Sequence, residues 1–397
     1  MPDWALFLLI LIAIAIGFFL GKQSRKTPKK TYGPIVDEDY VKGPNYLLNE
    51  QPDSTIEAFI SALEVSADTL QTHLALGNFL RRKGEASRAI RIHQNLLAHP
   101  SLTIEQSHEA QYELAIDFLK AGLFDRAERL LKELSVNDEH YRIRALHHLL
   151  EIYRDEREWR SGLDILSQLS GSRFNKQYEK WAPIKAHFCC ELAEESMAGS
   201  GVGSSNYLVS RKWLKKALSH DKESVRASLS LGKLEIDAGY YKQGMHQLQK
   251  VCHQHPDYLG EALTYLLIGY KRLNNIAGYH EFLLAINSQY CNDTLSIAIA
   301  DFVKEKKGHL AATEFIAQYL EKNSSVIVLD KFLHLYIECT EGDTRHYLQL
   351  IRTAIKETVE NAAKHACEHC GFKGRQIHWL CPSCKEWKGA PCKKLQD

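Results

Sequence analysis

The sequence has little proline and glycine for its length, with 10 prolines and 23 glycines in 397 residues. They fall mostly between stretches whose apolar residues recur at helical spacing, which favours helices over a turn-rich β fold. Charge of one sign is also lacking, because the net charge is only +1. A nucleic-acid-binding protein usually carries a clear basic excess, so the composition predicts no nucleic-acid partner.

Catalytic signatures are missing as well. The chain has no H-E-x-x-H motif, no glycine loop of the kind that cradles phosphate, and no nucleophile placed beside a base. We therefore predict that the protein is not an enzyme. Its composition, 45% hydrophobic and 25% charged, is instead typical of a chain that buries a sizeable core.

The N-terminus carries one long apolar run, Trp4–Leu20, which reads WALFLLILIAIAIGFFL and has no charge. Seventeen residues, at 1.5 Å per residue, are at the short end of what crosses a hydrocarbon core of ~30 Å. A cleaved signal peptide is the alternative, but the chain starts Met-Pro-Asp, and no A-x-A cleavage site stands between the apolar run and the basic residues that follow it. We predict a retained transmembrane anchor over residues 1–21.

Basic residues follow the apolar run rather than precede it: Lys22, Arg25, Lys26, Lys29 and Lys30. By the positive-inside rule, this basic linker (residues 22–39) stays in the cytoplasm. The sequence thus predicts a single-pass membrane protein whose N-terminus lies outside and whose bulk is cytoplasmic.

Residues 40–363 show helical apolar spacing and a period near that of tetratricopeptide repeats. Small residues recur in pairs twelve positions apart, as at Gly77 and Ala89, Ala115 and Ala127, and Gly232 and Gly244. Gly84, Gly122 and Gly239 fall where the two helices of a repeat should be joined. We predict an all-α solenoid of six to nine repeats whose concave face binds another protein.

Two parts of this array depart from the pattern. The glycine- and serine-rich stretch 197–210 sits where a helix–helix turn should be, which predicts a longer loop inside one repeat. Small positions are less clear in residues 257–360, which predicts degenerate or capping repeats there.

Ten cysteines would suggest disulfides only in a secreted chain. Five of them are scattered along helical stretches and are predicted to be small buried apolar residues: Cys189, Cys190, Cys252, Cys291 and Cys339. Four others form two C-x-x-C pairs near the C-terminus. This distribution is typical of a reducing compartment and one metal site.

The C-terminal region, residues 364–397, is predicted to be a small metal-binding domain. Its ligands would be Cys367, Cys370, Cys381 and Cys384, because four thiolates from two such pairs can hold one tetrahedral ion at ~2.3 Å. Zn²⁺ and iron both suit four sulfur ligands, and the sequence leaves the choice open. A dithiol redox motif is the alternative for a single pair.

Several neighbours of these cysteines are expected not to bind the ion. Cys392 lacks a partner, and the histidines at 365, 369 and 378 are not needed once four thiolates are available. Gly371 is expected to relieve the first turn. Phe372, Trp379 and Trp387 are expected to give this small domain an apolar shell.

Taken together, the anchor, the repeats and the paired cysteines resemble the lipopolysaccharide assembly protein B family. Matching stretches include YLLNEQPDSTIEAFISAL, HLALGNFLRRKGEASRAIRIHQNLL and AGLFDRAERL, and the tail segments CEHCGF and HWLCPSCKEW. The resemblance covers essentially the whole chain and implies a rubredoxin-like domain at its C-terminus. The glycine–serine stretch and the short ending after Trp387 depart from the family pattern, but neither removes a ligand.

The resemblance implies a regulatory adaptor on the cytoplasmic face of the Gram-negative inner membrane. Its implied partners are a membrane-bound AAA protease and the deacetylase that commits precursors to lipid A, whose degradation it would promote. The residues alone also allow a rubredoxin-like electron-transfer protein or a general protein-binding scaffold at the membrane. The sequence does not decide whether the chain forms a homo-oligomer.

Overall fold

The computed structural model describes residues 69–100, 102–171, 176–198, 204–290, 292–361 and 365–387. The predicted anchor (1–21) and basic linker (22–39) lie outside these residues, as do Cys291 and Cys392. Within the described ranges, no helix combines the length and the apolar character that a membrane span requires. The chain divides into two compact units at Leu130, and each is described by itself.

The described part of the first unit contains three complete helices and the start of a fourth: α4 (Leu70–Arg82), α5 (Ala86–Leu97), α6 (Ile104–Lys120) and α7 (Phe124–Asn137). Helix α4 packs on α5, and α5 packs on α6. Their apolar residues meet in two small clusters centred on Leu80 and Leu96. Thr103 begins α6 with a capping box, in which its hydroxyl accepts from the Gln106 N–H and the Gln106 side chain accepts from the Thr103 N–H.

The second unit holds the other helices and a small C-terminal sheet. Its α-helices are α8 (Glu139–Asp155), α9 (Trp159–Ser170), α10 (Lys176–Ala198), α11 (Ser204–His220), α12 (Val225–Asp237), α13 (Tyr241–Gln254), α14 (Leu259–Arg272), α15 (Ile276–Asn287), α16 (Asp293–Lys307), α17 (His309–Leu320), α18 (Val326–Ile337) and α19 (Gly342–Asn361). A short 3₁₀ helix, η1 (Pro256–Tyr258), precedes α14. Strands β1 (His365–Ala366) and β2 (Lys373–Gly374) pair antiparallel, with His365 opposite Gly374.

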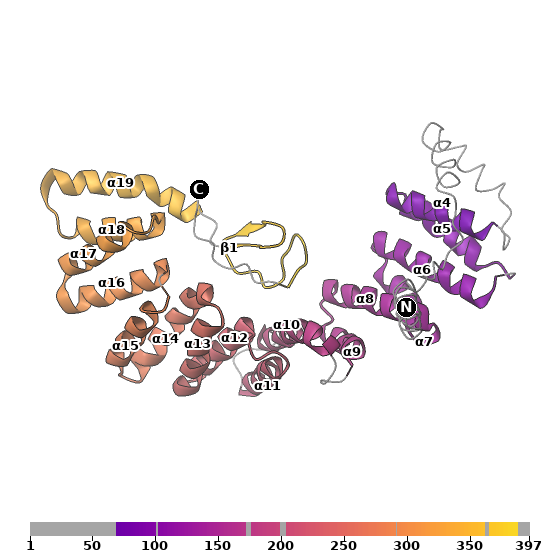
Figure 1. The fold of residues 1–397 in the computed structure, drawn as a ribbon, viewed down its shortest axis with the longest axis horizontal. Coiled ribbons are helices and arrows are strands. Elements are labelled where there is room, and N and C mark those ends of the chain that lie inside the picture. Colours follow the sequence, from indigo (N-terminus) through magenta and orange to yellow (C-terminus); the bar gives the residue numbers. More distant parts are fainter. Residues whose placement is uncertain are drawn as a thin grey trace, which may run out of the picture. The chain divides into compact units, whose positions relative to one another are not determined.

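In chain order, the α-helices of the described residues form eight pairs, from α4–α5 to α18–α19. In six pairs, a residue with positive φ (+53° to +89°) lies between the two helices: Gly84, Gly122, Arg157, Gly239, Asn274 and Gly308. In α18–α19, Gly342 (φ +66°) is the first residue of α19. In the remaining pair, α10–α11, the longer loop predicted over residues 197–210 is wrong for most of its length, because 197–198 belong to α10 and 204–210 belong to α11. Residues 199–203 lie outside the described residues. Within the second unit, α9–α19 follow one another along a curve, and the small sheet lies on its inner side (Figure 1). The predicted all-α repeat fold is confirmed, and regular pairing continues through residues 257–360.

Close helix crossings explain the small residues that recur in the sequence. Gly232 of α12 and Gly244 of α13 lie so close that a Cβ on Gly244 would stand 2.8 Å from the Gly232 carbonyl oxygen. Gly162 of α9 faces the Phe188 ring, where a Cβ would meet a ring carbon at 2.2 Å. In the first unit, Ala89 and Ala115 are fully buried. These positions therefore admit no larger side chain without moving a helix.

The cysteines outside the metal motif only partly follow the prediction. Cys189, Cys190 and Cys252 are buried, and burial raises the pKa of each of these thiols to about 12. They are accordingly unreactive apolar residues. For Cys339 the prediction is wrong, because this residue lies past the end of α18, in the turn before α19, and is exposed.

The Gly232–Gly244 crossing gives a test of the repeat packing. We expect Gly244→Val to lower the free energy of unfolding by about 2–3 kcal/mol, because the added side chain meets backbone that cannot move independently. Urea unfolding followed by circular dichroism measures the change. Ser219→Ala, at an exposed position of α11, should shift stability by less than about 0.5 kcal/mol. Equal stability of the two variants would contradict the close crossing.

Candidate metal centre

The four cysteines predicted as ligands lie on two tight turns of the same design. In the first turn, the Cys367 N–H donates to the Phe372 carbonyl (2.8 Å) and the Gly371 N–H donates to the Cys367 carbonyl (2.9 Å). In the second turn, the Cys381 N–H donates to the Glu386 carbonyl (3.0 Å) and the Lys385 N–H donates to the Cys381 carbonyl (2.9 Å). The two turns thus present their sulfurs in equivalent ways.

Both turns need a left-handed residue directly after the second cysteine. Gly371 has φ +74°, and Lys385, at the corresponding position, has φ +59°. Glycine adopts this conformation without steric cost, whereas a lysine does not. The sequence predicted this conformation at Gly371, but the lysine concealed the same geometry in the second turn.

The structure brings the four sulfurs together in the arrangement of a single-ion site. All four lie within 4.8 Å of one another. Across the two turns, Cys367 Sγ lies 3.7 Å from Cys384 Sγ, and Cys370 Sγ lies 3.6 Å from Cys381 Sγ. A tetrahedron of sulfurs bonded at ~2.3 Å to a central ion has edges of about 3.8 Å. The cysteines are therefore spaced to bind one ion, while its identity and its binding remain predictions.

Backbone N–H groups prepare the first pair of thiols for metal binding. A hydrogen bond from the Phe372 backbone is the main cause that lowers the pKa of Cys370 to about 6, and one from the Cys370 backbone lowers the pKa of Cys367. Thiolates rather than thiols bind metal ions. These two sulfurs therefore ionise more easily than an ordinary cysteine and favour a cation between the turns.

Little space for a substrate remains beside the sulfurs. Cys367 and Cys381 are buried, and the cavity next to them, which His365 and Phe372 also line, has a volume of about 10 Å³. That is room for roughly one water molecule. Four thiolates also complete a tetrahedral coordination sphere, which leaves no open position for catalysis. The geometry fits a structural ion or an electron carrier.

The two tryptophans of this C-terminal ribbon (residues 365–387) do not form a shell of their own around the metal site. Trp387 stacks on His187 of α10, with ring centroids 5.0 Å apart, and meets Phe188 at 5.6 Å and Trp159 of α9 at 6.0 Å. Trp379 stacks on Tyr258 at 5.3 Å. The expectation of a self-contained apolar shell was wrong for these two residues, because the repeat array supplies the apolar surface that they cover.

Phe372 does not form such a shell either. It is exposed and contacts His378 within the ribbon, with ring centroids 5.8 Å apart. Of the histidines near the cysteines, His365 is buried, whereas His369 and His378 are exposed.

A buried charge lies beneath Trp379. The guanidinium of Arg226 on α12 lies 5.8 Å from the indole and donates from Nη2 to Glu191 and Glu194 of α10, each at 2.8 Å. The Arg226 side chain is only 2% exposed. A guanidinium over an indole face gains cation–π energy, and the two carboxylates balance its charge. Arg226 thus joins α10, α12 and the ribbon.

His187 is held between these groups. Burial of its ring under the indoles, with the charge of Arg226 as a second cause, lowers the pKa of His187 to about 3. The ring is therefore neutral at physiological pH and stacks as a flat apolar group. Sequence reasoning singled out neither His187 nor Arg226, because single residues inside helices carry no spacing signal.

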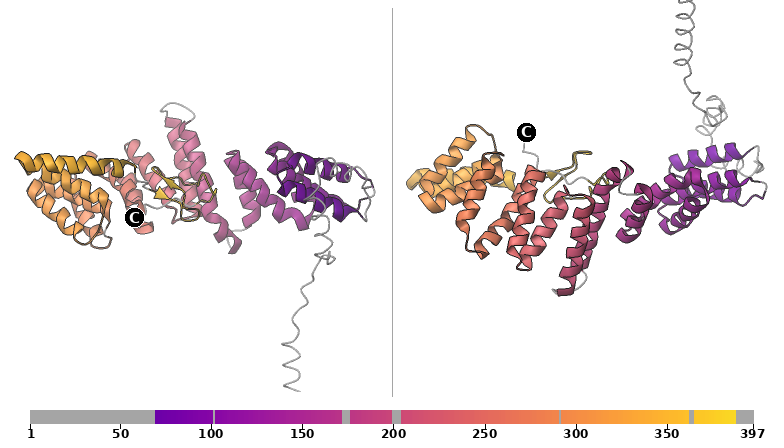
Figure 2. Two further views of the ribbon diagram at one scale, coloured as in Figure 1. Left: turned by 90° about the horizontal axis from the view of Figure 1, so that it is seen from above. Right: turned by 60° about the horizontal axis from the view of Figure 1, so that its bottom comes forward.

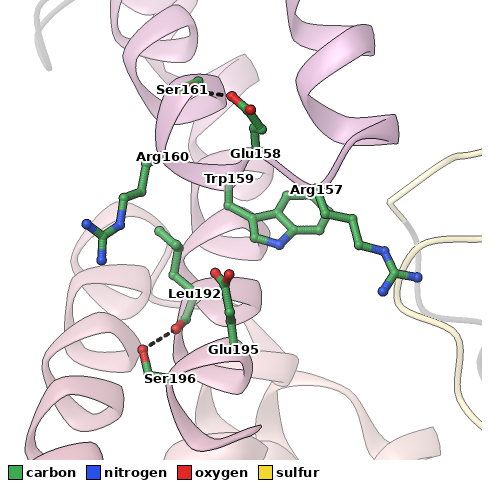
Figure 3. A pocket seen from close by; sticks show the side chains of 8 residues that line it. All are labelled: Arg157, Glu158, Trp159, Arg160, Ser161, Leu192, Glu195 and Ser196. Atoms are coloured by element: carbon green, nitrogen blue, oxygen red, sulfur yellow. Dashed lines mark hydrogen bonds between the residues drawn. The ribbon is translucent and has the colours of Figure 1, made fainter. Parts of the chain in front are cut away.

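A second hollow lies beside the docked ribbon, between α9 and α10. Arg157, Glu158, Trp159, Arg160, Ser161, Leu192, Glu195 and Ser196 line a pocket of about 440 Å³. Figure 3 shows Arg157 and Arg160 pointing to opposite sides of the Trp159 indole, with Glu195 below it. Two arginines and two glutamates balance one another, so charge does not select a class of ligand for this pocket.

Comparison with known proteins gives the same picture. Residues 365–388 match the family model described as a rubredoxin metal binding domain. The chain is 33% identical to lipopolysaccharide assembly protein B of Escherichia coli (strain K12) over 383 residues, which cover 96% of both chains. It is also 33% identical to the Haemophilus influenzae protein of the same name, again over 96% of both chains.

Solved structures add little. A tetratricopeptide repeat protein from Parabacteroides merdae matches 68% of this chain and 99% of its own, with 13% identity and a TM-score of 0.31. That score is too low to support an argument. The repeat fold follows here from the helix pairs and their turns.

The docking of Trp387 can be separated from metal binding. We expect Trp387→Ala to free the ribbon from α9 and α10 at a cost of about 2–3 kcal/mol, since a large, half-buried aromatic contact is lost. Limited proteolysis should then cut near the ribbon sooner, while metal content stays the same. Phe372→Ala is the matched control, because this aromatic lies in the ribbon but is exposed. Identical cleavage of the two variants would argue against docking.

Metal content tests the site itself. We expect one ion per chain by elemental analysis, and loss of that ion when Cys367 and Cys370 are both replaced by Ser, because two thiolates cannot complete the site. Visible thiolate-to-metal absorption would identify iron, whereas a colourless protein with one equivalent of zinc would exclude it. An unchanged metal content in the double variant would contradict the assigned ligands.

Proposed function

Because the chain belongs to the lipopolysaccharide assembly protein B family, we propose that it is a membrane-tethered adaptor that regulates lipid A biosynthesis. The adaptor would promote degradation of the committed-step deacetylase by a membrane-bound AAA protease. We further propose that residues 1–21 anchor it in the inner membrane, with the repeat array and the ribbon in the cytoplasm. A homo-oligomer is compatible with this role.

The docking of the ribbon on the array is the observation that best supports this proposal. Trp379 and Trp387 attach the ribbon to α9, α10 and the segment before α14, so that array and ribbon present one continuous surface. A client held on such a surface would depend on both parts. The ion would fix the second cysteine turn, Cys381–Glu386, which Trp379 and Trp387 flank, and would thereby keep this surface in shape.

A membrane tether gives the adaptor its physical advantage. Confinement to the membrane plane raises the effective concentration of the array near a membrane-bound protease, without any new contact between them. The adaptor needs no chemistry of its own for this task. That is consistent with a closed set of four thiolates and with relatives that are named for assembly.

The role of the ion can be tested in cells. In a strain whose only copy carries Cys367→Ser and Cys370→Ser, we expect the deacetylase to accumulate several-fold, because the ribbon loses its ion and the composite surface is disrupted. Immunoblotting of the deacetylase over time measures this. Cys339→Ser is the matched control, since this exposed cysteine lies outside the ribbon. If the deacetylase turns over normally in the double variant, the metal site is not part of the regulation.

Electron transfer is the second candidate, and one observation favours it. Cys370 is exposed and Cys384 is half-buried, so one edge of the metal site reaches the surface, where an electron carrier could approach. This function requires bound iron that is reversibly reduced. A redox-silent zinc ion would rule it out, and the adaptor proposal would be unaffected.

A further inference from the structure

The α10–α11 pair differs from the other helix pairs in length and position. Helix α10 has 23 residues and α11 has 17, whereas α12–α13 and α14–α15 have 12 to 14 residues in each helix. Figure 2 shows this pair extending beyond the neighbouring helix pairs of the second unit. Its far end can therefore meet a surface that the neighbouring helix pairs of the second unit do not reach (Figure 2).

Helix α11 exposes one face of unusual composition. Leu208 is 61% exposed and Val209 is 43% exposed, and the exposed residues Lys212, Lys215 and Lys216 follow them along the helix. At about 100° per residue, these five residues fall within about 120° of the helix circumference. We call them the α11 outer face. The opposite side of the helix is buried in the array through Ser210, Leu214 and Ala217.

Charge on this helix is of one sign. Residues 204–220 read SSNYLVSRKWLKKALSH and contain no aspartate or glutamate. Arg211 is already paired with Glu235 (2.6 Å), which leaves the three lysines to set the charge of the outer face. Lys216 also lies over the Trp213 ring, 4.8 Å from its centroid. Nearer the end of the pair, Met197 of α10 is also 45% exposed.

We propose that the α11 outer face docks on an anionic membrane surface. Its lysines would approach the headgroups, and Leu208 and Val209 would enter the boundary between headgroups and acyl chains. An interfacial contact combines apolar residues that enter the headgroup boundary with lysines that meet anionic headgroups. Helix α11 can supply both only from its exposed side, because its opposite side is buried in the array. Large apolar side chains exposed in this way offer no advantage to a purely electrostatic partner such as nucleic acid.

Magnitudes explain why such a contact needs a tether. Each basic residue near an anionic surface raises the partition onto it by about fivefold, so three lysines give roughly 100-fold. That is weak for a freely diffusing protein. A chain already confined to the membrane starts from a high effective concentration, and the same contact can then fix its orientation. The contact would hold the second unit against the bilayer while leaving the ribbon on the inner side of the curve.

The test uses the full chain reconstituted in vesicles. A benzophenone amino acid is placed at Leu208, the sample is irradiated, and lipid adducts are measured by mass spectrometry. In vesicles of phosphatidylethanolamine and phosphatidylglycerol, we expect strong lipid adducts, and in phosphatidylcholine alone we expect at least about a tenfold loss. Replacing Lys212, Lys215 and Lys216 by Gln should cause a similar loss in the anionic vesicles. Circular dichroism confirms that each variant is folded.

Leu310 on α17 provides the matched control position. It is 62% exposed, close to the value for Leu208, but its helix, HLAATEFIAQYL, has no lysine or arginine. Lipid adducts from Leu208 that far exceed those from Leu310 and that depend on the three lysines would support membrane docking. The proposal would be overturned by equal adducts at both positions, by adducts from Leu208 that are indifferent to lipid charge, or by adducts that link Leu208 to another protein chain.

Discussion

The C-terminal ribbon depends on a contact that lies outside it. A unit of about twenty residues with two-residue strands buries little apolar surface by itself, so a bound ion and the contact with the array would stabilise it together. The indoles of Trp379 and Trp387 point away from the ribbon and bury apolar surface against the array. His187 stays neutral beneath them, and Arg226 is held by two carboxylates. Both adjustments make the inner side of the array a surface on which aromatic rings can lie flat.

The array itself is built on two local constraints. Small residues let paired helices approach until backbone atoms nearly touch, as at Gly232 and Gly244. Left-handed residues at the turns then reverse the chain within a few positions. Sequence spacing reveals both, because they recur. The repeat architecture, the turn glycines and the two cysteine pairs could therefore be predicted before any coordinates were available.

What the sequence could not supply was the partner of each aromatic residue. Two tryptophans so near the cysteine pairs suggest an apolar shell around the metal site. Only the folded structure shows that Trp379 packs on Tyr258 and that Trp387 packs on His187. Left-handed turns also escape notice where glycine is absent, as at Arg157 and Lys385. Cys339 was misjudged because apolar spacing places a residue in a helix stretch but does not mark the turn at which that helix ends. In each case the deciding feature is a contact between distant residues, a turn or the end of a helix, and none of these recurs at a regular spacing in the sequence.

The position of the tryptophans at the end of the chain also sets an order of events. Trp387 meets Trp159 and Phe188, residues about two hundred positions earlier in the sequence. Ribosomes add about 5–20 residues per second, so α9 and α10 emerge many seconds before the ribbon that will cover them. During that interval, its inner aromatic surface lacks this cover and is open to chaperones or to premature association. The four cysteines, by contrast, span only residues 367–384 and can gather around an ion as soon as they emerge. A nascent chain that stalls before the ribbon is made would therefore release a folded array whose inner aromatic surface is not covered.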